Sequence, residues 1–141
     1  MMRPQIVLDT NVLFAGLYSR TGASFVLLDQ LYQHRVDIHL SVPLVLEYED
    51  VLKRDASRLG LTDADVDAAI NALCSIGKHH DIHYLWRPFL TDPKDDLVLE
   101  LAVASRCPII THNLRDFAGT KIFGIQVLTP VQFLRKIGVP L

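Results

Sequence analysis

Short apolar runs alternate with longer segments of helical period along the chain, and this alternation restricts the fold more than any other feature. Four runs have the length and composition of strands, at residues 5–9, 37–41, 108–111 and 126–129. A fifth candidate covers residues 79–86. Because strands that alternate with helices usually form a parallel sheet covered by helices, the sequence predicts an α/β fold with a central parallel sheet.

The segments between these runs carry apolar residues at helical spacing. Phe25, Leu28 and Leu31 recur in this way between the first two predicted strands. Thr62, followed three residues later by Asp65, is typical of a capping box at the start of a helix. The sequence predicts helices over residues 24–34, 43–54, 62–76, 96–105 and 130–137, and a further helix directly after Asp9.

Length and composition limit the possible classes of protein. The chain has 141 residues, half of them hydrophobic, which suits one domain over residues 1–141. No apolar run approaches the roughly 18 residues of a membrane-spanning helix, and the first residues, MMRPQIVLD, lack the apolar stretch of a secretory signal. Cys74 and Cys107 lie far apart in apolar surroundings, which is typical of free thiols in a cytosolic protein. We therefore expect a cytoplasmic protein without membrane contact.

Polar side chains follow the predicted strands at the points where the strands end. Asp9 ends the first strand, Ser41 the second and Thr111 the third, and Asn113 and Asp116 come shortly after Thr111. In a parallel sheet the carboxyl ends of the strands meet at one edge, where open α/β sheets bind their ligands. We therefore expect these side chains to lie close together.

The predicted helix over residues 96–105 adds further carboxylates to this edge. It leads into the third of these strands, so it runs antiparallel to that strand and begins at the same edge. Asp92, Asp95 and Asp96 lie at its start.

The predicted helix over residues 43–54 begins at the same edge and carries two candidate glutamates. Glu47 lies closer than Glu49 to the centre of the apolar stripe formed by Leu44, Tyr48, Val51 and Leu52. Counting Val45 into the stripe removes this difference. Glu47 is therefore the preferred inward residue, and Glu49 stays an alternative.

Carboxylates from four separate segments thus meet at one edge of the predicted sheet. Crowded carboxylates repel one another and shift towards protonation. A hard divalent cation such as Mg²⁺ or Mn²⁺ removes this repulsion, and both ions prefer oxygen ligands. An ion held in this way can activate water and stabilise charge on a phosphodiester. Each acid also has a plainer structural role open to it. Asp9 can cap the turn that follows it, and Asp95 or Asp96 can cap a helix. Asp116 can be a turn residue, and Glu47 a solvated helix residue.

The sequence resembles the PIN-domain family, ribonucleases that include the VapC-type toxins of bacterial toxin–antitoxin pairs. The residues that carry the resemblance are IVLDTNVLFAGL, SVPLVLEYEDVL, DPKDDLVLELAVAS and IITHNLRDF, in this order over about residues 5 to 130. The resemblance implies a three-layer α/β/α fold around a parallel sheet. It also implies an acidic pocket that binds Mg²⁺ or Mn²⁺, and metal-dependent cleavage of RNA.

The resemblance also implies roles for single residues. The first family acid matches Asp9, with Asn11 as its polar neighbour, and the second matches Glu47. The third matches Asp95, with Asp96 as the competing position.

The fourth family acid has a less direct match. The family often has Asp where this chain has Asn113, and Asp116, three residues on, can supply the charge. The resemblance implies that Asp9, Asp95 and Asp116 hold the metal and that Glu47 orients or deprotonates the attacking water. Thr111 and Asn113 then offer neutral contacts to metal, water or phosphate.

Three kinds of partner follow from these considerations. The net charge of −2 gives no overall basic signature, so RNA would have to bind through a local patch. Basic residues near the site segments are Arg3, Arg20, Lys94, Arg115 and Lys121. The resemblance further implies a small protein antitoxin that blocks the active site and a homodimer, and Phe14 and Tyr18 are candidates for the dimer interface.

Two other functions remain open at the level of sequence. One is a phosphatase or phosphotransferase with Asp9 as nucleophile, although haloacid-dehalogenase-type enzymes need a second Asp where this chain has Asn11. The other is a PIN-like module that binds RNA or protein without cleaving it, for which Asn113 at the fourth acidic position is the support.

Overall fold

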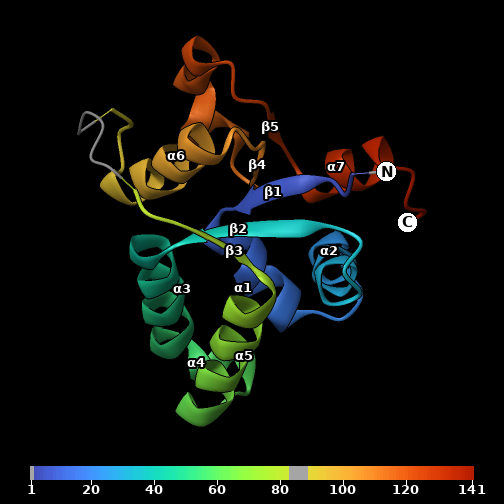
Figure 1. Cartoon of the computed structure of the whole chain (residues 1–141). Helices are drawn as coiled ribbons and strands as arrows, with labels where there is room; N and C mark the ends of the chain where they lie inside the picture. Colours follow the sequence, from blue (N-terminus) through green and yellow to red (C-terminus); the bar gives the residue numbers. More distant parts are fainter. Residues whose placement is uncertain (1, 83–88) are drawn as a thin grey trace.

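The computed structural model describes residues 2–82 and 89–141, which form a five-stranded sheet with only parallel pairs (Figure 1). The strand order β3-β2-β1-β4-β5 places β1 at the centre. The predicted central parallel sheet is therefore confirmed. The strands are β1 (Gln5–Leu8), β2 (Asp37–Ser41), β3 (Lys78–His80), β4 (Ile109–Ile110) and β5 (Val127–Leu128).

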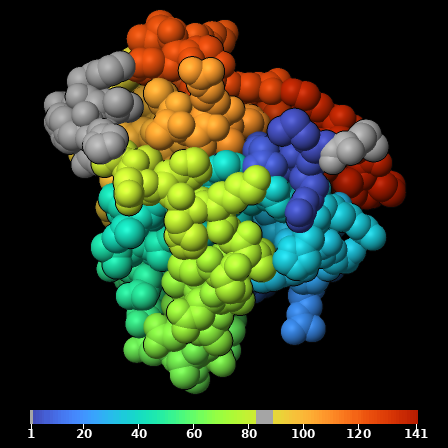
Figure 2. Space-filling model, viewed as in Figure 1, coloured from blue at the N-terminus to red at the C-terminus, as the bar shows by residue number. Residues whose placement is uncertain are grey.

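Helices cover both faces of the sheet in a three-layer α/β/α arrangement. The first five helices lie on one side, and α6 and the 3-10 segment η1 lie on the other (Figure 1). Figure 2 shows that residues of α5 and the edge strand β3 lie outermost on the face seen there. The helical elements are α1 (Thr10–Tyr18), α2 (Ala23–Tyr32), α3 (Val42–Arg54), α4 (Ala56–Leu59), α5 (Asp63–Ile76), α6 (Pro93–Ser105), η1 (Leu114–Phe123) and α7 (Pro130–Lys136).

The central strand β1 lies at the middle of the hydrophobic core. Its residues Ile6, Val7 and Leu8 are fully buried, as expected for a parallel strand that is covered on both faces. Tyr48 of α3 packs beside it without any exposed surface, and its hydroxyl donates a hydrogen bond of 2.5 Å to the Leu8 carbonyl oxygen. This bond fixes α3 against the end of β1, where the acidic residues begin.

We expect the Tyr48→Phe variant to lose about 1–2 kcal/mol of unfolding free energy, because a hydrogen bond between buried groups is removed while the ring remains. Urea unfolding followed by circular dichroism measures this loss. Tyr32→Phe is the matched control, since Tyr32 is 41% exposed at the end of α2. A Tyr48→Phe variant as stable as the wild type would contradict this account of the contact between α3 and β1.

Several predicted boundaries differ from the structure. The predicted strands over 5–9, 108–111 and 126–129 are too long, because residues at their ends do not belong to the sheet. Asp9 and Thr129 instead cap α1 and α7 with their side chains. Of the strand predicted over residues 79–86, His79 and His80 belong to β3, and residues 83–86, Trp86 included, lie outside the described part.

The start of α6 was predicted three residues too late. Asp92 is the N-cap and accepts the Lys94 amide hydrogen bond at 2.9 Å, so the helix begins at Pro93 rather than at Asp96. Proline suits this first helical position because it needs no amide donor there. In the described ranges, 2–82 and 89–141, no helix is long and apolar enough to cross a membrane.

Candidate active site

A pocket of about 340 Å³ opens at the carboxyl end of β1, beside the N-termini of α1 and α6 and the side of α3. It lies where the chain changes from one side of β1 to the other, the position at which open α/β sheets bind ligands. Six carboxylates and two cations are among its lining residues. The full lining is Asp9, Thr10, Asn11, Phe14, Glu47, Val51, Asp55, Arg58, Asp92, Lys94, Asp95, Asn113 and Asp116.

Asp9 is held rigidly at the tip of β1. Its Oδ1 accepts a hydrogen bond from the Thr10 amide at 2.8 Å, and its Oδ2 accepts one from the Thr111 hydroxyl at 2.7 Å. Burial raises the pKa of Asp9, these two hydrogen bonds oppose the rise, and the nearby charge of Asp116 adds to it. Asp9 thus caps the segment that follows it, which is the helix α1 rather than a turn, and it lines the acidic pocket as well.

The two neighbouring acids Asp95 and Asp96 on α6 point in different directions. Asp95 lines the pocket, whereas Asp96 is only 1% exposed and lies away from it. The carboxylate of Asp96 accepts the Phe89 amide at 3.1 Å and the Leu90 amide at 2.8 Å. Asp96 therefore anchors the segment before α6, and it does not belong with the pocket residues as the sequence analysis had placed it.

The surroundings of Asp95 make it the most perturbed acid of the pocket. Burial raises the pKa of Asp95 to about 7, and the nearby charges of Asp9, Asp92, Asp116 and Asp96 push in the same direction. A carboxyl group with such a pKa is half protonated near neutrality unless a cation compensates the charge. A strongly perturbed carboxyl group in a cleft is a typical mark of a functional site.

Glu47 faces the pocket and Glu49 does not. Glu47 Oε1 lies 3.6 Å from Lys94 Nζ, which joins α3 to the start of α6 across the pocket. Glu49 lies instead 3.9 Å from Lys53 of its own helix. The helical position of Glu47 was therefore predicted correctly.

The segment after β4 contributes neutral and acidic groups to the same pocket. Asn113 and Asp116 both line it, so the pocket contains both candidates for the fourth position. Thr111 is fully buried behind them and contacts Asp9. Asn11 also lines the pocket, and its Oδ1 accepts the His112 amide at 3.3 Å.

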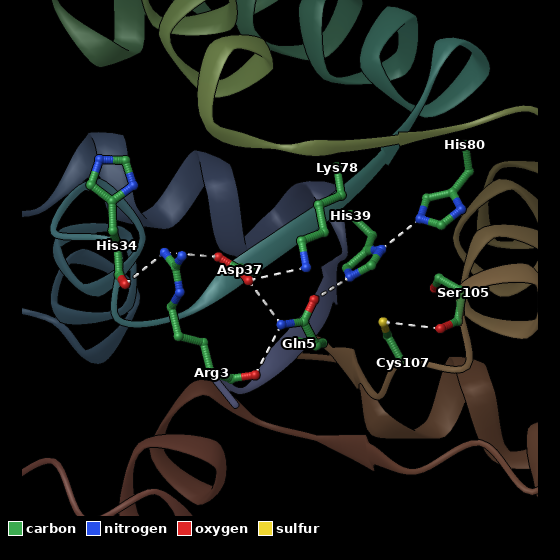
Figure 3. A network of polar contacts seen from close by, with 9 residues as sticks. All are labelled: Arg3, Gln5, His34, Asp37, His39, Lys78, His80, Ser105 and Cys107. Carbon is green, nitrogen blue, oxygen red and sulfur yellow. Dashed lines mark hydrogen bonds and ion pairs between the residues drawn. The ribbon is translucent and has the colours of Figure 1, made fainter. Parts of the chain in front are cut away.

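Arg3, a basic residue predicted to lie near the site, lies away from the pocket. It precedes β1 and so lies at the amino end of the strand, opposite Asp9. Figure 3 shows it in a polar network there, where its guanidinium donates to the His34 carbonyl oxygen and lies 3.4 Å from Asp37. Gln5 links Asp37 in the same network to His39.

One pocket residue, Arg58, is not predicted from the sequence. It lies in α4, a short helix that follows α3 and ends at Gly60 with a positive φ of 69°. Four residues give too short a periodic pattern to reveal a helix from sequence. The turn at Asp55, where α3 ends, brings Arg58 back to the pocket wall beside Phe14.

The donor set of the pocket suits a hard divalent cation. All of its strong donors are oxygens, and Asp95 carries unfavourable repulsion that such a charge would relieve. Across the described ranges, no three His, Cys, Asp or Glu side chains are arranged as a ready metal cage. Mg²⁺ commonly takes only one or two carboxylates and keeps several waters, so these residues fit an ion held partly through water.

Comparison with known proteins identifies the family. A family model described as PIN domain matches residues 5–115. Among solved structures, the crystal structure of VapBC2 from Rickettsia felis bound to a DNA fragment from their promoter contains a chain with the same fold. The TM-score is 0.60 at 14% identity over 88% of this chain and 96% of that chain. No curated protein matches the sequence. Because the family model spans most of the sequence, the chain belongs to the PIN domain family.

Proposed function

We propose that this PIN domain, comprising residues 1–141, is a metal-dependent endoribonuclease. The observation that carries the proposal is the convergence of Asp9, Glu47, Asp95 and Asp116 on one pocket from four separate segments. Such a set is costly for a purely structural pocket, because Asp95 is held with a pKa of about 7. Metal-assisted hydrolysis of a phosphodiester makes use of that arrangement.

Asp9, Asp95 and Asp116 would hold Mg²⁺ or Mn²⁺, with Asn113 as a neutral neighbour. We assign the fourth position to Asp116 because it alone of that pair carries a charge. The ion would supply a Lewis acid for the phosphate oxygens and lower the pKa of a bound water. Thr111 keeps Asp9 oriented by donating its hydroxyl hydrogen bond to Oδ2.

Glu47 would act on the attacking water. It lies on the pocket wall with Lys94 3.6 Å away. The water oxygen forms a bond to phosphorus, the bond from phosphorus to the 3′ oxygen breaks, and that oxygen takes up a proton. Glu47 accepts or orients the proton lost by the water. The products would be a 5′-phosphate and a 3′-hydroxyl.

We further propose that the protein is the toxin of a toxin–antitoxin pair in the cytoplasm. Membership of the PIN family and the fold shared with a chain of the VapBC2 complex support this reading. It implies a small protein antitoxin as partner and a homodimer as the working assembly.

The test is cleavage of a pool of end-labelled RNAs by the purified protein in Mn²⁺, in Mg²⁺ and in EDTA. We expect cleavage in at least one metal and none in EDTA. Glu47→Gln should lower kcat about 100-fold. Glu49→Gln, on the same helix but paired with Lys53 outside the pocket, should leave kcat unchanged.

Cleavage that continues in EDTA, or that Glu47→Gln leaves intact, would contradict this assignment. RNA binding without turnover in any divalent metal would indicate instead a PIN-like module that binds RNA. A phosphoryl group trapped on Asp9 would indicate a phosphotransferase.

A further inference from the structure

We propose that Phe14, Tyr18 and Arg58 form a stacking platform that holds a base of single-stranded RNA next to the acidic pocket. This inference deepens the proposed nuclease function and rests on it. The platform would position the nucleotides that flank the cleaved phosphodiester.

The two rings of the platform lie along one face of α1, leading away from Asp9. Phe14 and Tyr18 are four residues apart, their ring centroids are 6.1 Å apart, and their planes differ by 13°. Phe14 lines the acidic pocket, and Tyr18 lies one helical turn further from it. From Thr10 to Tyr18 the helix rises about 12 Å, the length of a few stacked nucleotides at about 3.4 Å each.

Arg58 completes the platform from a different element. Its guanidinium carbon lies 5.2 Å from the Phe14 ring centroid and 6.0 Å from that of Tyr18. It also lines the pocket, so one cation touches both rings and the acidic site. Within the described part of the chain Arg58 makes no ion pair, which leaves its charge available for a phosphate.

The exposure of Tyr18 agrees with a ligand that stacks. Tyr18 is 60% exposed, among the most exposed large hydrophobic side chains in the described ranges, although its ring pairs with that of the half-buried Phe14. Parallel aromatic rings beside an arginine bind unpaired bases of any sequence through stacking, while the cation binds the backbone.

The same geometry addresses an electrostatic problem of the site. Six carboxylates line the pocket, and RNA carries one negative charge per nucleotide. Of the two lining cations, Lys94 lies beside Glu47, whereas Arg58 has no acidic partner among the described side chains. Stacking on Phe14 and Tyr18 would therefore supply attraction that the acidic pocket does not.

The test is binding of short single-stranded RNAs that carry 2-aminopurine, measured in EDTA so that no cleavage is needed. Stacking quenches 2-aminopurine fluorescence, a signal that a merely structural role of Tyr18 would not produce. We expect quenching with the wild type and with Tyr18→Phe, which keeps the ring. We expect about tenfold weaker binding and little quenching with Tyr18→Ala. Tyr32→Ala, on α2, is the control for removal of an exposed tyrosine.

Three further measurements separate the contributions of the cation, the rings and the acidic pocket. RNA binding by Arg58→Gln should release about one counterion fewer than binding by the wild type, as expected for a lost phosphate contact. The binding constant of the variant should therefore depend less steeply on salt concentration. Duplex RNA of the same sequence should bind more weakly than the single strand, because its bases are not free to stack. In Mn²⁺, Tyr18→Ala should raise KM with little change in kcat.

The proposal is overturned if the wild type gives no quenching, or if Tyr18→Ala binds as the wild type does. The oligomeric state is followed by size-exclusion chromatography. The proposal is also overturned if Tyr18→Ala is a monomer where the wild type is a dimer and quenching persists in the variant, because the rings would then form a subunit interface. Quenching that depends on Tyr18 without cleavage in any metal would support the platform and contradict the nuclease. Cleavage that does not depend on Tyr18 would support the nuclease and contradict the platform.

Discussion

The Asp95→Asn variant should cleave single-stranded RNA about 1,000-fold more slowly than the wild type in Mn²⁺, because a charged group at the reacting centre is removed. The metal-free variant should at the same time be more stable than the wild type. Asp95 is half buried at the start of α6, and this burial, together with the charges of four other carboxylates, raises its pKa to about 7. A neutral amide of the same shape removes that repulsion.

The sign of the pH dependence follows from this raised pKa. The folded protein holds the Asp95 proton up to about pH 7, whereas the unfolded chain releases it near 3.8, the ordinary pKa of an aspartate. Stability from this group is therefore fully present below about pH 4 and is lost as the pH rises to 7. Because Asp95 is only half buried, solvent screening reduces this loss of unfolding free energy at pH 8 to about 1 kcal/mol.

Thermal unfolding in EDTA at pH 5 and pH 8 measures the effect. The wild type should lose more stability than Asp95→Asn between these two values. Addition of Mn²⁺ at pH 8 should stabilise the wild type and hardly affect the variant. An Asp95→Asn variant that is less stable than the wild type at pH 8, or that cleaves RNA at full rate, would contradict the role given to Asp95.

Substitution of the neighbouring acid, Asp96→Ala, should destabilise the protein, whereas Asp95→Asn should stabilise it. We expect Asp96→Ala to lose about 3 kcal/mol of unfolding free energy. The carboxylate of Asp96 is the acceptor for the Phe89 and Leu90 amides, and it is almost fully buried. Alanine leaves both amides without this acceptor. Asp96→Asn keeps one acceptor oxygen and should lose roughly half as much stability.

Unfolding in guanidinium measures the unfolding free energy of the wild type, Asp96→Ala and Asp96→Asn. At a temperature where Asp96→Ala remains folded, its kcat in Mn²⁺ should fall far less than that of Asp95→Asn. The two neighbours thus serve as controls for each other, since one variant tests the chemistry and the other tests the anchor. Equal stability of Asp96→Ala and the wild type would show that the two amides find other acceptors.

The contrast between these neighbours shows where reasoning from sequence stops. The alternation of apolar runs and helices predicted the parallel sheet. The strand ends predicted that Asp9 and Asp116 would share an edge, and the direction of the helix before the third of these strands added Asp95 to it. Which of two adjacent acids faces the pocket depends on backbone amides at Phe89 and Leu90. Their positions follow from tertiary structure, so no local pattern reveals them.

Arg3 and Arg58 illustrate the same limit for the basic residues. Arg3 precedes β1, and its place at the far end of the strand follows from chain direction, so the sequence did contain that information. The position of Arg58 depends on a sharp turn after α3 and on a helix of four residues. The segment η1 was missed as well, because it is a 3-10 segment interrupted at Phe117 and lacks a regular apolar period.

The hydrogen bond between Thr111 and Asp9 joins residues 102 positions apart. Pairing of β1 with β4 brings them together, and contacts so distant in sequence are slow to form. A chain still being synthesised carries Asp9 and Glu47 long before the segment around Asp95 and Thr111 has left the ribosome. The complete acidic pocket therefore cannot form before Asp116, the last of its lining residues, has left the ribosome, so the ribosome that makes this protein is not exposed to a finished pocket until then.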